Sequence, residues 1–112
     1  MTDNKPKIQR LARFLKKNPK DSFTKFALAL ELLKQDQVSK AQLLFESVLE
    51  QDPDYLGVYY HLGKLYEQIG RQKDAKDLYT TGIEVAKKQT HERTKLELQE
   101  ALEVLNIEMD QQ

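Results

Sequence analysis

The sequence predicts an all-α protein built from antiparallel helical hairpins, for three reasons. Apolar residues recur at spacings of three and four along most of the chain, which places them on single faces of helices. The pairs Asn18-Pro19 and Asp52-Pro53 end two helical segments and lie 34 residues apart. The composition, with few Gly and Pro, no Cys, 32% charged and 39% hydrophobic residues, is typical of a soluble helical protein. We therefore expect about six helices in a single domain over residues 1–112.

The first helix is expected over residues 6–17. Pro6 suits the first turn, where its missing N–H costs nothing, and Leu11 and Leu15 share one apolar face. A shift of 34 residues places Leu11 on Phe45, at the same point of a later helix. This first helix therefore corresponds to the second half of a repeat whose first half is absent.

A complete repeat is expected over residues 22–55. Asp21 or Ser22 is expected to cap its first helix, because a short side-chain oxygen can accept a hydrogen bond from an unpaired backbone N–H. Ser39 and Gln42 have the spacing of a capping box at the start of its second helix. The expected core residues of this repeat are Leu28, Ala29, Leu32, Ala41, Leu44, Phe45, Val48 and Leu49.

The repeat at residues 56–89 carries the clearest pattern. Gly70 is expected to end its first helix in a left-handed conformation. Small residues at Gly63, Ala75 and Gly82 should let helices approach, so a bulky residue at Gly63 or Ala75 should clash. The full pattern is Tyr59-x-x-Leu62-Gly63-x-x-Tyr66, followed by Ala75-x-x-x-Tyr79 and Gly82.

This pattern resembles the tetratricopeptide repeat, a helix-turn-helix unit of 34 residues. The resemblance implies a right-handed α-α superhelix of hairpins that serves as a protein–protein interaction module. Against the family pattern, Lys7 stands where Ala is expected and Phe14 where a small residue is usual. Lys25 takes the place of the first signature aromatic in repeat 22–55.

A last helix is expected over residues 90–109, with Thr90 as its N-cap, and it resembles the capping helix that ends such arrays. In the 34-residue register, Glu97 and Glu100 occupy the places of Gly63 and Tyr66, and both carboxylates should stay solvated. Its expected core stripe is Leu98, Ala101, Leu102, Leu105 and Met109.

The resemblance implies that partners bind on the concave wall formed by the first helix of each repeat. One end of this expected groove is apolar, and the other is polar and suited to pairing a carboxylate. The candidate partner-binding residues are Phe23, Phe26, Leu30, Leu33, Tyr60, His61, Lys64, Gln68 and Lys95. An alternative is that the first helix covers the apolar end, or that a second copy covers it and the chain is an assembly protein that forms a homodimer.

Other functions find little support in the sequence. The carboxylate clamp that binds acidic chaperone tails needs Asn residues that the expected groove lacks, so chaperone-tail binding is a minor alternative. With no Cys and no Gly-rich phosphate loop, we expect no enzyme, no cofactor and no metal site. The formal net charge of zero does not favour nucleic acid, and the absence of a long apolar run predicts no membrane span and a cytoplasmic protein.

Charge is distributed unevenly along the chain. Residues 1–20 hold seven Lys or Arg against one Asp, whereas residues 90–112 hold two Lys or Arg against six Asp or Glu. Such runs are most often solvated helix faces. Their opposite signs also permit a head-to-tail contact between copies of the chain.

Overall fold

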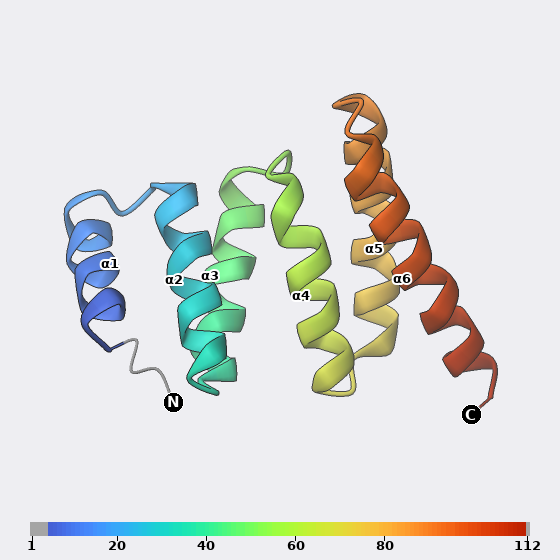
Figure 1. Cartoon of the computed structure of the whole chain (residues 1–112), viewed down its shortest axis with the longest axis horizontal. Helices are drawn as coiled ribbons and strands as arrows, with labels where there is room; N and C mark the ends of the chain where they lie inside the picture. The colour runs from blue at the N-terminus through green and yellow to red at the C-terminus, as the bar shows by residue number, and fades with distance from the viewer. Residues whose placement is uncertain (1–4, 112) are drawn as a thin grey trace. The chain divides into compact units, whose positions relative to one another are not determined.

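The computed structural model describes residues 5–111, and all regular secondary structure among them is helical. Figure 1 shows the helices in chain order. Their bounds are α1 Lys5–Lys17, α2 Ser22–Lys34, α3 Val38–Gln51, α4 Leu56–Gln68, α5 Gln72–Lys88 and α6 Glu92–Asp110. The predicted all-α fold class is confirmed, and the 34-residue period holds: α2 and α4 begin at residues 22 and 56, α3 and α5 at 38 and 72.

The chain falls into two compact units, each described by itself. Unit 1 comprises Met1–Tyr55 and unit 2 comprises Leu56–Gln112. The boundary coincides with the predicted boundary between repeats 22–55 and 56–89. The assignment of residues 1–112 to one domain stays a prediction.

The core of unit 1 lies in the hairpin of α2 and α3. Six of the predicted core residues are buried there, and the other two, Leu44 and Leu49, are half-buried. The buried six are Leu28, Ala29, Leu32, Ala41, Phe45 and Val48.

The two capping predictions in unit 1 have different outcomes. Asp21 is the N-cap of α2, and its Oδ1 accepts a hydrogen bond from the Thr24 N–H at 2.9 Å, as predicted. The capping box at Ser39 is wrong, because α3 already begins at Val38. Asp36 adopts a left-handed conformation (φ 60°), and the Gln37 N–H donates to the Leu32 carbonyl at 2.9 Å. This tight turn moves Ser39 into the first turn of α3.

In unit 2, glycines allow α5 to pack closely on its neighbours. A Cβ at Gly63 would lie 2.3 Å from Tyr79 Cε1, and a Cβ at Gly82 would lie 2.7 Å from Tyr59 Cβ. The three signature tyrosines are buried in the core, as predicted: Tyr59, Tyr66 and Tyr79. Gly70 ends α4 with φ 83°, also as predicted.

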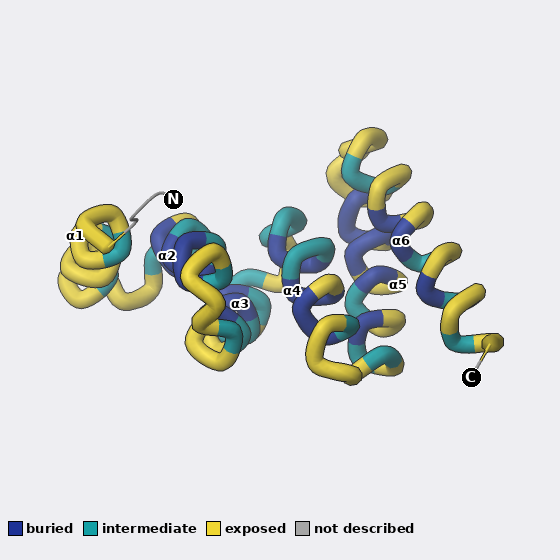
Figure 2. The backbone as a smooth tube through the Cα atoms, turned by 60° about the horizontal axis from the view of Figure 1, so that its bottom comes forward, coloured by how far each residue is buried: buried dark blue, intermediate teal, exposed yellow. Residues whose placement is uncertain are grey.

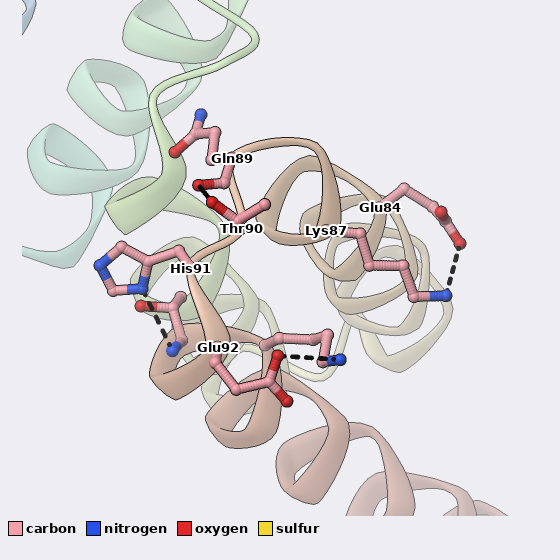
Figure 3. Close-up of polar contacts among 8 residues, drawn as sticks. Glu84, Lys87, Gln89, Thr90, His91 and Glu92 are labelled. Carbon is pink, nitrogen blue, oxygen red and sulfur yellow. Dashed lines mark hydrogen bonds and ion pairs between the residues drawn. The ribbon is translucent and has the colours of Figure 1, made fainter.

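The connection from α5 to α6 differs from the sequence prediction by one residue. Thr90 adopts a left-handed conformation (φ 51°), and the following His91 N–H donates to the Ala86 carbonyl at 2.9 Å. His91, not Thr90, is the N-cap of α6: its Nδ1 accepts from the Thr94 N–H at 3.4 Å (Figure 3). Thr90 therefore ends α5 instead of starting α6.

The helices α1 and α6 are only partly covered, as Figure 2 shows. No residue of α1 is buried, and it lies against α2 with Ile8, Leu11 and Leu15 half-buried. In α6, the predicted stripe is confirmed: Leu98, Ala101 and Leu105 are buried, and Leu102 and Met109 are half-buried.

Candidate functional site

A cleft of about 180 Å³ lies between α4 and α6 in unit 2. Tyr60 and Lys64 line it from α4, one helical turn apart on the side of α4 that the buried stripe leaves free. From α6 come two carboxylates and two small apolar side chains, Glu97, Glu100, Ala101 and Val104. The cleft thus combines an aromatic ring, an aliphatic floor and charges of both signs.

The α4 side of the cleft is ordered by contacts among neighbouring side chains. The rings of Tyr60 and His61 meet edge to face with centroids 5.7 Å apart, and Lys64 Nζ lies 5.8 Å from the Tyr60 ring centroid. Burial lowers the pKa of His61 below its usual value, and the carboxylate of Glu97 opposes this shift. His61 is therefore held neutral beside the cleft near pH 7.

Glu67 links this surface to the core. The buried hydroxyl of Tyr79 donates a hydrogen bond to Glu67 Oε2, and Lys64 Nζ lies 3.8 Å from the same oxygen. Burial, together with the carboxylate of Glu67, raises the pKa of Tyr79 far above its usual value. Glu67 counters the charge of Lys64 and Arg93 counters that of Glu97, so Glu100 leaves the cleft with an excess of negative charge.

The sequence reasoning missed the contribution of α6 to this cleft. It placed Glu97 and Glu100 in solvent, and both are exposed, yet they also face Tyr60 and Lys64. Glu97 Oε1 lies 3.4 Å from Arg93 Nε, in an exposed pair one turn apart. The four residues of α6 that line the cleft have the spacing i, i+3, i+4, i+7, and this spacing could have shown from the sequence that they share one helix face.

Two predicted binding residues do not line the cleft. Gln68 is exposed at the end of α4, and Lys95 Nζ instead pairs with Glu92 Oε2 at 3.1 Å within α6 (Figure 3). Their role in partner binding stays a prediction.

In unit 1, the four predicted apolar residues do not form one open wall. The Phe26 ring packs on Phe45 and Tyr55, with centroids 6.0 Å and 5.3 Å away, and Leu30 and Leu33 are half-buried. Phe23 is 68% exposed. Phe26 is therefore in part a packing residue, because one ring of α3 and one ring of the following loop pack against it.

Lys25, in the place of the first signature aromatic, is a buried polar link that the sequence did not reveal. Its Nζ donates to Ser47 Oγ at 2.8 Å and to Gln51 Oε1 at 2.7 Å, so it joins α2 to α3. Gln51 Nε2 in turn donates to Ser22 Oγ at 2.7 Å and to the Lys20 carbonyl at 2.8 Å. Hydrogen bonds thus replace the aromatic packing that Tyr59 provides in unit 2.

Comparison with known proteins agrees with this geometry. A model of the tetratricopeptide repeat matches residues 32–93, more than half of the chain. The chain belongs to the tetratricopeptide repeat family. A tetratricopeptide repeat domain protein from Salinibacter ruber, solved by NMR, is 52% identical over 78% of this chain and 88% of its own, with a TM-score of 0.74.

Two more distant structures share the tetratricopeptide fold. PcrH, in complex with the chaperone binding region of PopD, is 14% identical with a TM-score of 0.85, over 91% of this chain and 77% of its own. The Yersinia enterocolitica type III secretion translocator chaperone SycD is 13% identical with a TM-score of 0.85, over 92% of this chain and 72% of its own. At these identities the likeness shows the fold alone. No curated protein matches the chain.

Within residues 5–111, no helix is long and apolar enough to cross a membrane. In the same part of the chain, no group of three or more His, Cys, Asp or Glu is arranged to hold a metal ion.

Proposed function

We propose that the chain is a protein-interaction module that binds a segment of a partner protein in the cleft between α4 and α6. Membership in the tetratricopeptide repeat family, whose proteins are generally non-enzymatic scaffolds, supports the general role. The observation that carries the specific proposal is the cleft itself, where Tyr60, Ala101 and Val104 offer apolar surface beside Glu97 and Glu100.

The charge of the cleft indicates the chemistry of the partner. Lys64 is countered by Glu67, whereas Glu100 forms no ion pair among the described residues. A partner segment with a Lys or Arg side chain next to an aliphatic one would pair its cation with Glu97 or Glu100 and place its apolar group on Ala101 and Val104. This differs from the expectation of a bound carboxylate, which considered Lys64 without the glutamates of α6.

The relatives supply a parallel for segment binding. PcrH was solved with a region of another protein, and a further tetratricopeptide structure, YrrB (19% identity, TM-score 0.60), is described as having an unusual peptide-binding site. The cleft, at about 180 Å³, has room for only a few side chains of a partner, so the bound segment is expected to be short.

The test is a binding assay with two fluorescent peptide pools that share aliphatic residues and differ only in carrying Lys and Arg or Asp and Glu. Fluorescence anisotropy should show tighter binding of the basic pool. Tyr60→Ala and Glu97→Gln should each weaken it by about tenfold, equivalent to ~1.4 kcal/mol. Glu84→Gln removes an exposed carboxylate of α5 that does not line the cleft and that, like Glu97, pairs with a basic residue of its own helix; it should leave binding unchanged. Preference for the acidic pool, or equal effects of Glu84→Gln and Glu97→Gln, would refute the proposal.

A further inference from the structure

Two helix faces lie open among the described residues, one on α1 and one on α6. Of the seven large apolar side chains that are exposed in this part of the chain, five belong to these faces or border them. They are Phe14 (49% exposed), Phe23 (68%), Leu96 (55%), Val104 (46%) and Ile107 (53%). Exposed apolar side chains gathered in this way are typical of interaction surfaces.

The open face of α1 borders a groove of about 470 Å³ between α1 and α2. Lys7, Arg10, Leu11 and Phe14 line it from α1, and Phe23 lies on its α2 side. The helix α1 holds six Lys or Arg and no acidic residue. The groove thus combines apolar side chains with the cations of Lys7 and Arg10, and the one carboxylate in its lining, Asp21, caps α2.

The repeat register identifies what belongs in this groove. In unit 2, α5 packs on α4: a Cβ on Gly63 would lie 2.3 Å from Tyr79 Cε1, and a Cβ on Gly82 would lie 2.7 Å from Tyr59 Cβ. The residues of α1 two periods, or 68 positions, before Ala75, Tyr79 and Gly82 are Lys7, Leu11 and Phe14. These are three of the residues that line the groove, so it is the position of a first helix of a repeat.

The open face of α6 has the complementary character. Its residues Arg93, Leu96, Glu97 and Glu100 stand 34 positions after Tyr59, Leu62, Gly63 and Tyr66. The earlier four are buried in the α4–α5 hairpin, whereas the four on α6 are exposed. The face of α6 that would contact a second helix is therefore uncovered in the described residues.

The two open faces carry opposite charge at the positions that would meet. Lys7 replaces the small residue of the second helix, and Glu97 and Glu100 replace the small residue and the aromatic of the first. Overall α6 holds six Asp or Glu against two Lys or Arg. Arg93 is the basic exception on this face, and it pairs with Glu97 within α6. The departures from the family pattern are thus complementary to each other.

We propose that copies of this chain associate head to tail, with α6 of one copy packed into the α1–α2 groove of the next. The helices α6 and α1 then form the two halves of a composite repeat, and Glu100 approaches Lys7 of the next copy. Lys7 can take part because its side chain is 53% exposed beside its pair with Glu31. Since the two surfaces differ, the contact can repeat from copy to copy into rings or filaments. The α6 face shares Glu97 and Glu100 with the proposed peptide cleft, but the association between copies does not require the cleft to bind a partner.

The test is sedimentation velocity of the full chain over a range of concentrations at low and high salt. We expect the average mass to exceed that of one chain and to fall as salt screens the charges. Two double variants reverse charge at the two faces and beside them: Arg10→Glu in the groove with the neighbouring Arg13→Glu on α1, and Glu100→Lys on the open face with the neighbouring Glu103→Lys on α6. Each alone should weaken association at least about tenfold. Mixed in equal amounts, they should associate again, because each then meets the opposite charge.

The matched control is Lys73→Glu with Lys76→Glu, which makes the same charge change at exposed positions of α5. It should associate like the parent chain, and circular dichroism should show equal helix content in all variants. A parent chain that stays monomeric at every concentration overturns the proposal. So does association that persists in both reversed variants, or a mixture of the two that stays monomeric.

Discussion

The contact between Gly63 and Tyr79 shows how one residue sets the distance between two helices. The equivalent position in the first repeat is Ala29, which is fully buried. In the 34-residue register the ring that corresponds to Tyr79 is Phe45, which carries no hydroxyl. In unit 2 the Tyr79 hydroxyl is bonded to Glu67, which fixes the ring against Gly63.

We predict that Gly63→Ala destabilises the protein by about 2 kcal/mol, because the added Cβ would lie 2.3 Å from Tyr79 Cε1 and the anchored ring cannot move away. Urea unfolding monitored by circular dichroism measures this loss. In a Tyr79→Leu background the same substitution should cost clearly less, since the flexible Leu can shift. An equal cost in both backgrounds would mean that the ring is not the cause.

His61 should make stability depend on pH. Its pKa in the folded protein lies below the ordinary value of 6.5. The unfolded chain therefore binds more protons at this residue as the pH falls through that value. The stabilisation is present above about pH 6.5 and is lost as the pH falls below it. Urea unfolding at several pH values should show a flatter pH dependence for His61→Gln than for the parent chain. An unchanged slope would contradict the assignment.

At the scale of the element, α1 is held differently from the other helices. It has no buried residue, and its Lys7 Nζ forms an ion pair of 3.0 Å with Oε1 of the buried Glu31 in α2. The same oxygen also pairs with Lys34 at 3.3 Å, while Glu31 Oε2 is buried without a hydrogen bond. The pKa of Glu31 is lowered. The largest cause is the hydrogen bond from Lys7, which outweighs the opposite effect of burial.

Hydrogen exchange should therefore find the amides of α1 least protected among the six helices, because local opening there uncovers little apolar surface. Lys7→Gln should speed exchange in α1 further, by about fivefold or ~1 kcal/mol, since it removes a charged hydrogen bond to a buried carboxylate. Lys16→Gln changes an exposed charge in the last turn of α1 and serves as the control. If both substitutions act alike, the ion pair with Glu31 does not hold α1 in place.

At the scale of the whole molecule, a formal net charge of zero conceals a basic α1 and an acidic α6. The proposed self-association uses the outer faces of these two helices, whereas the proposed partner cleft lies between α4 and α6. Glu97 and Glu100 lie on both surfaces, whereas Tyr60 and Lys64 belong to the cleft alone and the α1 residues to the association alone.

The two activities should therefore be separable. We expect Arg10→Glu with Arg13→Glu to abolish association and leave binding of the basic peptide pool unchanged, because neither residue lines the cleft. Tyr60→Ala should weaken binding of the basic peptide pool and leave association unchanged. Anisotropy and sedimentation on the same preparations measure both properties. Loss of both activities in either variant would show that the two surfaces are coupled.

Much of the architecture could be predicted from the sequence by itself. The spacing of Leu62, Gly63 and Tyr66 identified a helix face, and the 34-residue recurrence assigned equivalent positions such as Ala41 and Ala75, which are both buried. Such patterns can be recognised because helix periodicity depends on residues close in sequence, and a repeat shows the same periodicity more than once. The N-cap predictions at Ser39 and Thr90 were wrong because Asp36 and Thr90 adopt left-handed backbone conformations, which the residue types alone did not indicate.

Only the tertiary structure decided how exposed residues group into surfaces. Phe23 and Phe26 looked alike in sequence, yet the first is exposed and the second packs on Tyr55. Glu97 and Glu100 were predicted to be solvated, and the structure also brings them to Tyr60 and Lys64 across the cleft. The physical reason is that a core stripe is set by spacing within one helix, whereas a binding surface depends on which side chains of different helices come within reach.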